Sequence, residues 1–272
     1  MPFKFIVSGI TLFFLGLQLN LYGSSFMIHY ELKIKLDTVK LPEQAILNTG
    51  YLKPGIRQYI VFTTDTGVQK RLDIRIWQRD ISIEKSAEGD VFVTRQTWLS
   101  YDSSKFTQFL SVNNLNDFKP RFHSQESHGH LFAYNWYSDS VVGADSVLNN
   151  LKAGFKIKLN WTALNWNLDL ETIEMLPMDH YKNFYITFYD AGIGMPQKLL
   201  YTVVGEEAVS LYNCPTKLKC WKLLMKAEFK GMHFTETFWV TKDSHELIKE
   251  KDDLGNGKYR YKIRLPDVIS QI

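Results

Sequence analysis

The chain has 272 residues, of which 45% are hydrophobic and 14% aromatic, a composition that excludes a disordered chain and supplies enough side chains for a large core. Its 32 basic and 29 acidic side chains give a formal net charge of +3, which is too close to balance to favour nucleic acid as a partner.

The N-terminal segment MPFKFIVSGITLFFLGLQLNLYGSSF predicts export. Lys4 is followed by an apolar run over residues 5–17 and by small residues at 23–25, which is the order of a secretory signal peptide. We therefore expect a signal peptide over residues 1–25 and a periplasmic or otherwise exported cell-envelope protein. The alternative is an uncleaved membrane anchor, which the polar amide of Gln18 in the apolar window disfavours.

Alternating apolar and polar residues predict β-strands along most of the remaining chain. Residues 26–37 read FMIHYELKIKLD, and a period of two over that length indicates a strand with one buried and one exposed face. Turn-forming residues, as in AEGD, KDSH and DLGNG, separate several of the runs, which favours an antiparallel sheet. The other predicted strands cover residues 57–64, 71–85, 91–101, 106–112, 130–137, 184–190, 199–212, 220–229, 233–241 and 258–265.

One stretch predicts a helix, LDLETIEMLP at residues 168–177. Asp169 is a candidate N-cap, and Leu170, Ile173 and Leu176 share one helical face before the proline that ends the stretch.

The expected fold class is mainly β. A single sheet of about ten strands tends to curl, and no long polar linker separates the runs. We therefore expect a single domain over residues 26–272, a curled antiparallel half-barrel with the short helix over its concave side.

Five motifs in the second half carry a resemblance to a known family: ETIEMLPM, FYITFYDAG, YTVVGEEAV, CWKLLM and TFWVTKDSHELIKEKDDLGNGKYRYKIRL. In their order and spacing they resemble an uncharacterised family of bacterial envelope domains, of the Bacteroidetes type, related in fold to the LolA and LolB lipoprotein carriers. The resemblance implies an exported protein with a curled sheet, and the carriers use the concave face of such a sheet for acyl chains. It brings no catalytic residues.

The histidines of FHSQESHGH, which are His123, His128 and His130, have a spacing that a metal site could use. Gly129 and the polar neighbours instead indicate a hairpin tip with solvated histidines, so no metal is predicted.

No catalytic residue and no cofactor are predicted. Glu206 and Glu207 are adjacent in a strand and point to opposite faces, which argues against a paired-carboxylate site. The sequence has no G-x-S-x-G elbow, no H-E-x-x-H and no phosphate-binding glycine loop.

Aromatic residues are the remaining signal. Core packing and cross-strand pairing explain any one of them, but a half-barrel has an inner face that one helix cannot cover completely, so some can line an apolar concavity. The candidate ligand-lining residues are Trp77, Trp98, Tyr101, Phe132, Tyr134, Trp136, Tyr185, Trp221 and Trp239.

The two cysteines, Cys214 and Cys220, have five residues between them. A zinc site needs about four ligands, and a thioredoxin-type pair has about two intervening residues. In an oxidising compartment we expect a disulfide that contributes about 2 kcal/mol; two unpaired thiols are the alternative.

These patterns predict a non-enzymatic exported envelope protein that binds a hydrophobic or lipid-like ligand on the concave face and does not span the membrane after signal removal. One alternative is an envelope scaffold with a self-filled barrel, whose edge strands pair with a protein partner. Another is a secreted hydrolase, which would need catalytic groups converging in one cleft.

Overall fold

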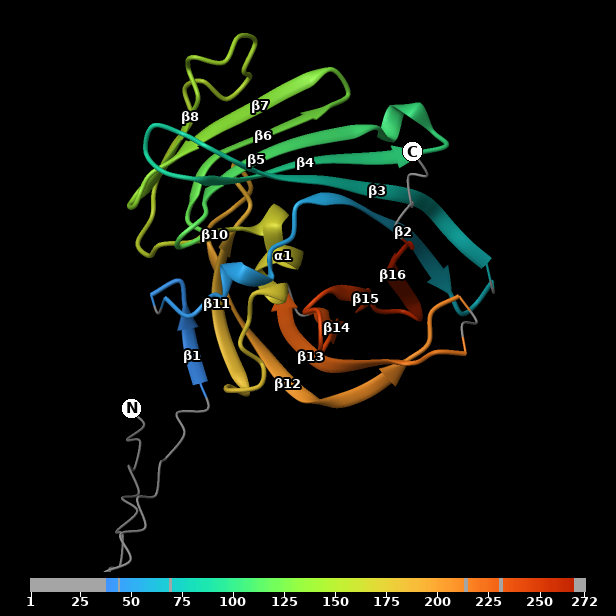
Figure 1. Ribbon diagram of the computed structural model, residues 1–272. Coiled ribbons are helices and arrows are strands. Elements are labelled where there is room, and N and C mark those ends of the chain that lie inside the picture. Colours follow the sequence, from blue (N-terminus) through green and yellow to red (C-terminus); the bar gives the residue numbers. More distant parts are fainter. Residues whose placement is uncertain (1–37, 44, 69, 213–214, 230–231, 267–272) are drawn as a thin grey trace, which may run out of the picture. The chain divides into compact units, whose positions relative to one another are not determined.

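The computed structural model describes residues 38–43, 45–68, 70–212, 215–229 and 232–266 (Figure 1). These residues belong to one compact unit of the chain, residues 35–272. The expected signal peptide and the first expected strand, at 26–37, lie outside the described residues.

Strands dominate the described part of the chain. They are β1 (Thr38–Leu41), β2 (Gly55–Asp65), β3 (Lys70–Glu84), β4 (Val91–Ser100), β5 (Thr107–Asn114), β6 (Pro120–Ser127), β7 (His130–Trp136), β8 (Ser140–Gly143), β9 (Lys156–Lys158), β10 (Leu164–Asn165), β11 (Asn183–Tyr189), β12 (Gln197–Val209), β13 (Leu218–Phe229), β14 (Met232–Thr241), β15 (Leu247–Asp253) and β16 (Lys258–Arg264). The helical elements are α1 (Asp169–Glu174) and three 3-10 turns, Thr49–Tyr51, Ser103–Lys105 and Trp166–Leu168.

All these strands join one open, curled sheet. Along the sheet the order is β1, β11, β12, β13, β14, β15, β16, β2, β3, β4, β5, β6, β7, β8 and β9, and β10 pairs with β11 beside this path. Consecutive strands pair through short connections, and the antiparallel pair of β16 with β2 joins the two halves of the chain. The predicted curled sheet is thereby confirmed. Its antiparallel pairing has two exceptions, because β1 and β10 lie parallel to β11.

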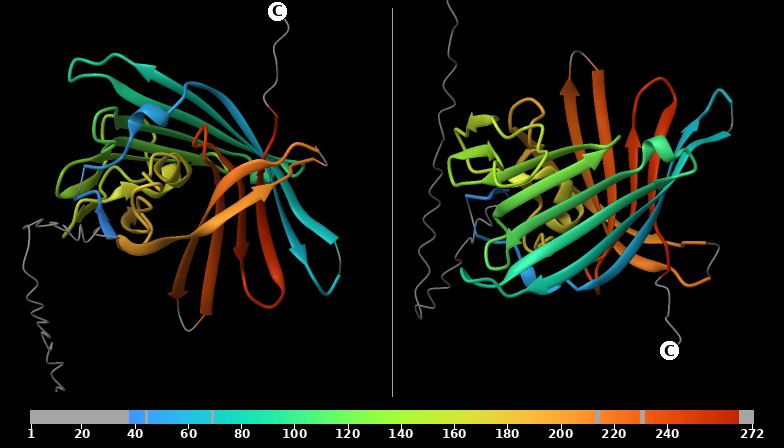
Figure 2. Two further views of the ribbon diagram at one scale, coloured as in Figure 1. Left: turned by 60° about the horizontal axis from the view of Figure 1, so that its bottom comes forward. Right: turned by 90° about the horizontal axis from the view of Figure 1, so that it is seen from above.

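Helix α1 lies inside the curl, between the wall formed by β2 to β7 and the wall formed by β11 to β16 (Figures 1 and 2). Its apolar residues Leu170 and Ile173 are buried in the main core together with Tyr59 of β2 and Phe238 of β14. The short helix over the concave side is thereby confirmed.

Two details of the helix prediction are wrong. The N-cap is Leu168, and the Asp169 side chain accepts a hydrogen bond from the amide of Leu170 at 2.8 Å instead of capping the helix. The α-helix ends at Glu174, before the proline. The Met175 amide contacts the carbonyl oxygens of both Glu171 and Thr172, and the Leu176 amide then bonds to Ile173 in the tighter 3-10 pattern.

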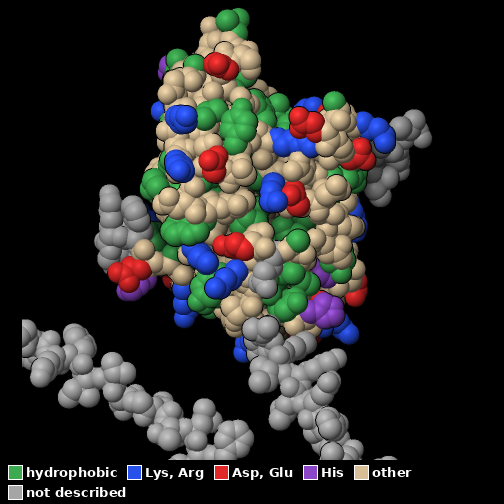
Figure 3. All heavy atoms as spheres, turned by 90° about the vertical axis from the view of Figure 1, so that its left-hand side faces the viewer, with side chains coloured by type: hydrophobic (Ala, Val, Ile, Leu, Met, Phe, Trp, Pro, Cys, Tyr) green, Lys and Arg blue, Asp and Glu red, His purple; other side chains and the backbone are tan. Residues whose placement is uncertain are grey.

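Ten of the predicted strands are present, with ends that differ by a few residues. The strands missed are β1, β6, β8, β9, β10 and β15. They were missed because they are short or because polar residues occupy most of their positions, as in β6. On the face shown in Figure 3, charged side chains of both signs are interspersed with hydrophobic ones, which agrees with the near-balanced composition.

Candidate functional site

The concave face of the sheet carries charged side chains as well as apolar ones. Side chains alternate between the two faces of a strand, and the buried Tyr59 and Trp77 mark the inward positions of β2 and β3. Arg57 lies on the same face of β2 as Tyr59, and Arg79 lies on the same face of β3 as Trp77. The two arginines are 4% and 3% exposed. A buried charge is costly unless it is paired, so each of these guanidinium groups needs a partner from inside the curl.

Glu174 at the end of α1 is the partner of Arg57. Its Oε2 accepts a hydrogen bond from the Arg57 guanidinium, and its Oε1 accepts one from the amide of Leu247 at 2.8 Å. The backbone carbonyl of Glu174 contacts Nδ1 of the buried His245 at 3.2 Å, and the His245 ring stacks on Tyr51 at 3.7 Å. One end of the helix is thereby fixed to β2 and to the segment that begins β15.

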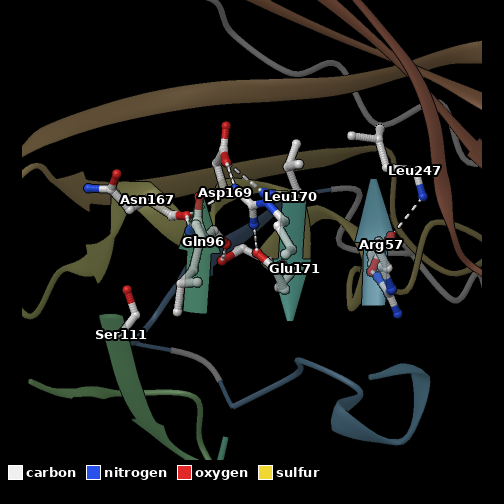
Figure 4. Close-up of polar contacts among 12 residues, drawn as sticks. Arg57, Gln96, Ser111, Asn167, Asp169, Leu170, Glu171 and Leu247 are labelled. Carbon is white, nitrogen blue, oxygen red and sulfur yellow. Dashed lines mark hydrogen bonds and ion pairs between the residues drawn. The ribbon is translucent and has the colours of Figure 1, made fainter. Parts of the chain in front are cut away.

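Arg79 holds the start of the helix. It donates to Glu171, lies 3.9 Å from the Asp169 carboxylate, and donates to the carbonyl oxygen of Asn167 at 3.1 Å. The amide of Gln96 on β4 donates to the same carbonyl at 2.7 Å. Figure 4 shows Gln96, Asn167, Asp169 and Glu171 grouped at this end of the helix.

A second group of buried charges continues along β14, β15 and β16. Lys262 donates to Glu250 at 2.6 Å, and Arg260 donates to Asp252 at 2.5 Å. Glu236 stands opposite Asp252 in the register of β14 and β15. Burial, with the charge of Glu250, raises the pKa of Asp252 to about 7, and burial together with Asp252 raises the pKa of Glu236 well above its usual value.

A cavity of about 680 Å³ opens on the concave side between the turn Trp166–Leu168 and strands β12 to β14. Its volume falls within the range of about 300 to 1,000 Å³ that is typical of small-molecule sites. The lining residues are Trp166, Gln197, Lys198, Leu199, Met225, Lys226, Ala227, Glu228, Phe234 and Glu236.

None of the nine predicted ligand-lining aromatics is among these residues, and the structure distributes them over several places. Trp77 belongs to the main core, and Trp98 stacks on it with 4.0 Å between the ring centres. Trp98 and Trp221 are partly buried and pack against this core. The β7 residues pack in a separate core cluster, where Tyr134 and Trp136 are buried and Phe132 is half-buried.

The other three predicted aromatics do not lie on the concave face. Tyr101 is exposed in the turn after β4. Tyr185 alternates with the buried Phe184 on β11, and Trp239 alternates with the buried Phe238 on β14, so both point to the opposite face.

The cavity therefore has a different lining from the one the sequence suggested. Large inward rings pack against one another and fill the space between their strands, as the stacked Trp77 and Trp98 do. Space is left where the inward positions carry smaller or more flexible side chains, namely Leu199, Met225 and Ala227.

The predicted histidine cluster is divided between core and surface. His128 lies in the turn between β6 and β7 with a φ of 54°, and His130 begins β7. His123 on β6 is buried, its Nδ1 lies 2.9 Å from the hydroxyl of Ser111, and the Asn165 amide donates to both groups at 3.2 Å. Burial lowers the pKa of His123 to about 4.

The contact between Ser111 and His123 brings together the residue types of a nucleophile and a base. Ser111 is 0% and His123 is 1% exposed, so no substrate can reach either group. The pair therefore acts in the structure as a buried polar contact between β5 and β6.

Glu206 and Glu207 point to opposite faces of β12, as predicted. Glu206 pairs with Lys242 at 2.5 Å, and Glu207 pairs with Lys222 at 2.8 Å.

Cys220 is buried on β13 beside Trp239, on the face away from the cavity, and burial raises the pKa of its thiol to about 11. Cys214 lies outside the described residues, so the disulfide stays a prediction.

The profile of a protein family, DUF3108, described as proteins of unknown function, matches residues 70–264, which extend from β3 to β16. The chain belongs to the DUF3108 family. The match begins about a hundred residues before the motifs that carried the sequence resemblance, and it includes Arg79 and the carboxylates of the helix. No curated protein matches the sequence of this DUF3108 chain.

Two solved structures are similar to it. A β-barrel-like protein of a domain of unknown function, DUF1849, from Brucella abortus has 10% identity and a TM-score of 0.48, over 79% of this chain and 98% of that one. A protein from Bacteroides fragilis with a YmcC-like fold, proposed to be exported, has 11% identity and a TM-score of 0.33, over 81% of this chain and 98% of that one. The family description names no enzymatic activity. In the described part of the DUF3108 chain, no helix has both the length and the apolar character needed to cross a membrane.

Sequence reasoning missed the buried charges, although a signal was present. Glu171 and Glu174 stand in NLDLETIEMLPM, a short helix with apolar residues on more than one side. Such a helix is surrounded by the rest of the protein, so its carboxylates need cationic partners. The sequence does not identify the cationic partners of Glu171 and Glu174, because these partners lie on β2 and β3, more than ninety residues earlier in the chain.

Proposed function

We propose that this DUF3108 chain is a non-enzymatic binding protein of the cell envelope, and that its ligand is a small amphipathic or lipid-like molecule held in the cavity on the concave face. The cavity of about 680 Å³ is the observation that carries the proposal. Trp166, Leu199, Met225 and Phe234 give it apolar walls, and apolar walls with few polar groups are typical of sites for such ligands.

The helix acts in this proposal as a fixed plug. Its two ends are tied to β2 and β3 through Glu174 and Glu171, and breaking such buried ion pairs is costly. Trp166 of the cavity lining belongs to the turn that leads directly into this helix. A fixed helix therefore holds that part of the cavity wall in place without a ligand, which lowers the ordering cost of binding.

Export and a relation to the LolA and LolB carriers also belong to the proposal. Export is supported by the N-terminal residue pattern, and the carrier relation by the order of motifs in the second half. The alternative of a scaffold that pairs through its edges has less support. The edge strands β1 and β9 have 4 and 3 residues, and both contain lysine, which discourages strand addition.

The test uses two matched tryptophan variants on β13. Both Ala227 and Lys226 border the cavity, but their side chains lie on opposite faces of β13. The Ala227 side chain shares the inward face with Met225, whereas the Lys226 side chain is exposed on the outward face. Lipid extracted with the envelope-purified protein is identified by mass spectrometry, and melting temperatures are measured with and without added single-chain amphiphiles.

We expect copurified lipid and a ligand-dependent rise in melting temperature in the wild type. Ala227→Trp fills the cavity and should abolish both, and Lys226→Trp should retain both. A wild-type protein without bound lipid, whose melting temperature no amphiphile raises, would refute the proposal.

A further inference from the structure

Glu236 is the one charged side chain that points into the cavity among its ten lining residues. Lys226 and Glu228 stand opposite Thr235 and His233 in the β13–β14 register, and they share the face that is turned away from the core. The ammonium of Lys198 lies 5.7 Å from the ring centre of Tyr185, on the outer face of β11 and β12.

Glu236 also adjoins a buried group of charges in which carboxylates outnumber cations. We call the carboxylates of this group the carboxylate cluster: Asp169, Glu171, Glu236, Glu250 and Asp252. The cations that pair with these carboxylates are Arg79, Arg260 and Lys262. When all five carboxyl groups are ionised, the group therefore has two more negative than positive charges. The side chain of Glu236 forms neither a hydrogen bond nor a close ion pair with any described residue, and the charge of Arg260 only partly offsets the charges of the neighbouring carboxylates.

This excess of negative charge determines which ligand charge is favourable in the cavity. In a partly buried site an uncompensated carboxylate is expensive, so it takes up a proton or a cation. Burial and the charges of Asp252 and Glu250 raise the pKa of Glu236, and burial and the charge of Glu250 raise the pKa of Asp252. A cationic group beside Glu236 would supply the missing positive charge, whereas an anionic group would add to the surplus.

The cation that fits this place is organic. Within the described residues, no three or more His, Cys, Asp or Glu side chains are grouped as a metal ion would need. The remaining inward walls are apolar, apart from Gln197, and they include Trp166. Tryptophan is the aromatic residue that interacts most favourably with organic cations. A molecule with an apolar chain and a positively charged end matches both parts of the lining.

We propose that the ligand of this cavity combines an apolar chain with a protonated amine, and that Glu236 binds the ammonium group. The assignment rests on the proposed binding function and names the chemical class of its ligand. It distinguishes this cavity from a fatty-acid site, where a cationic side chain would face the ligand carboxylate.

The test compares three probes of equal chain length by titration calorimetry, below their micelle-forming concentrations: decylammonium, decanol and decanoate. The full mature chain is used as the wild type and as the variants Glu236→Gln and Glu228→Gln. Glu228 is the matched control, because it belongs to the same lining but points outward and is exposed.

We expect decylammonium to bind at least about tenfold more tightly than decanoate. Glu236→Gln should weaken decylammonium about tenfold while leaving decanol unchanged, and Glu228→Gln should change neither. Equal or tighter binding of decanoate, or an amine preference that survives Glu236→Gln, would overturn the assignment and leave the binding function standing. Failure of all three probes to bind would overturn both.

Discussion

The buried ion pair of Arg57 with Glu174 gives a quantitative test of how the fold is held together. In Glu174→Gln the amide oxygen can still accept from Leu247, so the variant removes mainly the charge that faces Arg57. Arg57 is 4% exposed and is left as an unpaired buried cation. Loss of one partner of such a pair costs about 3 to 5 kcal/mol. Glu174→Ala also leaves the Leu247 amide without its acceptor, which adds about 1 kcal/mol.

Arg57→Met should cost about 3 kcal/mol for the same reason. In the double variant Arg57→Met/Glu174→Gln no charge is left unpaired, so we expect a total cost below about 2 kcal/mol and a coupling energy of several kcal/mol between the two sites. Urea unfolding of the wild type, both single variants and the double variant provides the four free energies.

The exposed pair of Lys222 with Glu207 is the control, since its side chains are 37% and 43% exposed. The same cycle there should give a coupling below about 1 kcal/mol. If the cost of the Arg57/Glu174 double variant equals the sum of its single variants, the two charges do not stabilise each other and the argument for a fixed helix fails.

Four further predictions follow from single residues. The pKa of His123 is lower in the folded than in the unfolded protein, so its contribution to stability is complete above about pH 6.5 and is lost as the pH falls towards 4. The difference between the two pKa values corresponds to about 3 kcal/mol of unfolding free energy. In His123→Asn the unfolding free energy should therefore depend less on pH over this range. The pH dependence expected for Glu236 is the opposite, since its raised pKa gives a contribution to stability that is complete below about pH 4 and is lost at higher pH. Glu236→Gln should therefore be more stable than the wild type above neutral pH but not at pH 4. An equal difference in unfolding free energy between variant and wild type at the two pH values would contradict this. A Cβ at Gly143 would lie 1.7 Å from a backbone carbonyl oxygen, so Gly143→Ala should cost more than about 2 kcal/mol in urea unfolding, and a smaller loss would mean that the backbone yields there. Envelope-purified protein unfolded without reductant should leave no thiol to label if Cys214 and Cys220 form a disulfide, whereas labelling of both would exclude it.

Much of the fold could be predicted from the spacing of apolar residues along the chain. Period-two alternation identified ten strands, and the spacing of Leu170 and Ile173 identified the helix, because each of these signals depends only on residues that are neighbours along the chain. The same alternation explains why Phe238 and Trp239 lie on opposite faces of β14, in two different core clusters. In β3, however, Arg79 is buried and Ile74 is 49% exposed, so the rule that apolar residues face the core does not hold at either position.

Local sequence patterns were sufficient to predict the class of the protein, which is a series of strands with one short helix and a sheet long enough to curl. The position of the cavity and the pairing of the buried charges depend on contacts between residues far apart in the chain. Cavities form where inward side chains from different strands fail to fill a volume, and Ala227, Leu199 and Phe234 become neighbours only through the β12 to β14 pairing. A buried carboxylate such as Glu236 acquires its chemistry from partners that the fold brings to it, and no local pattern in one chain carries that information.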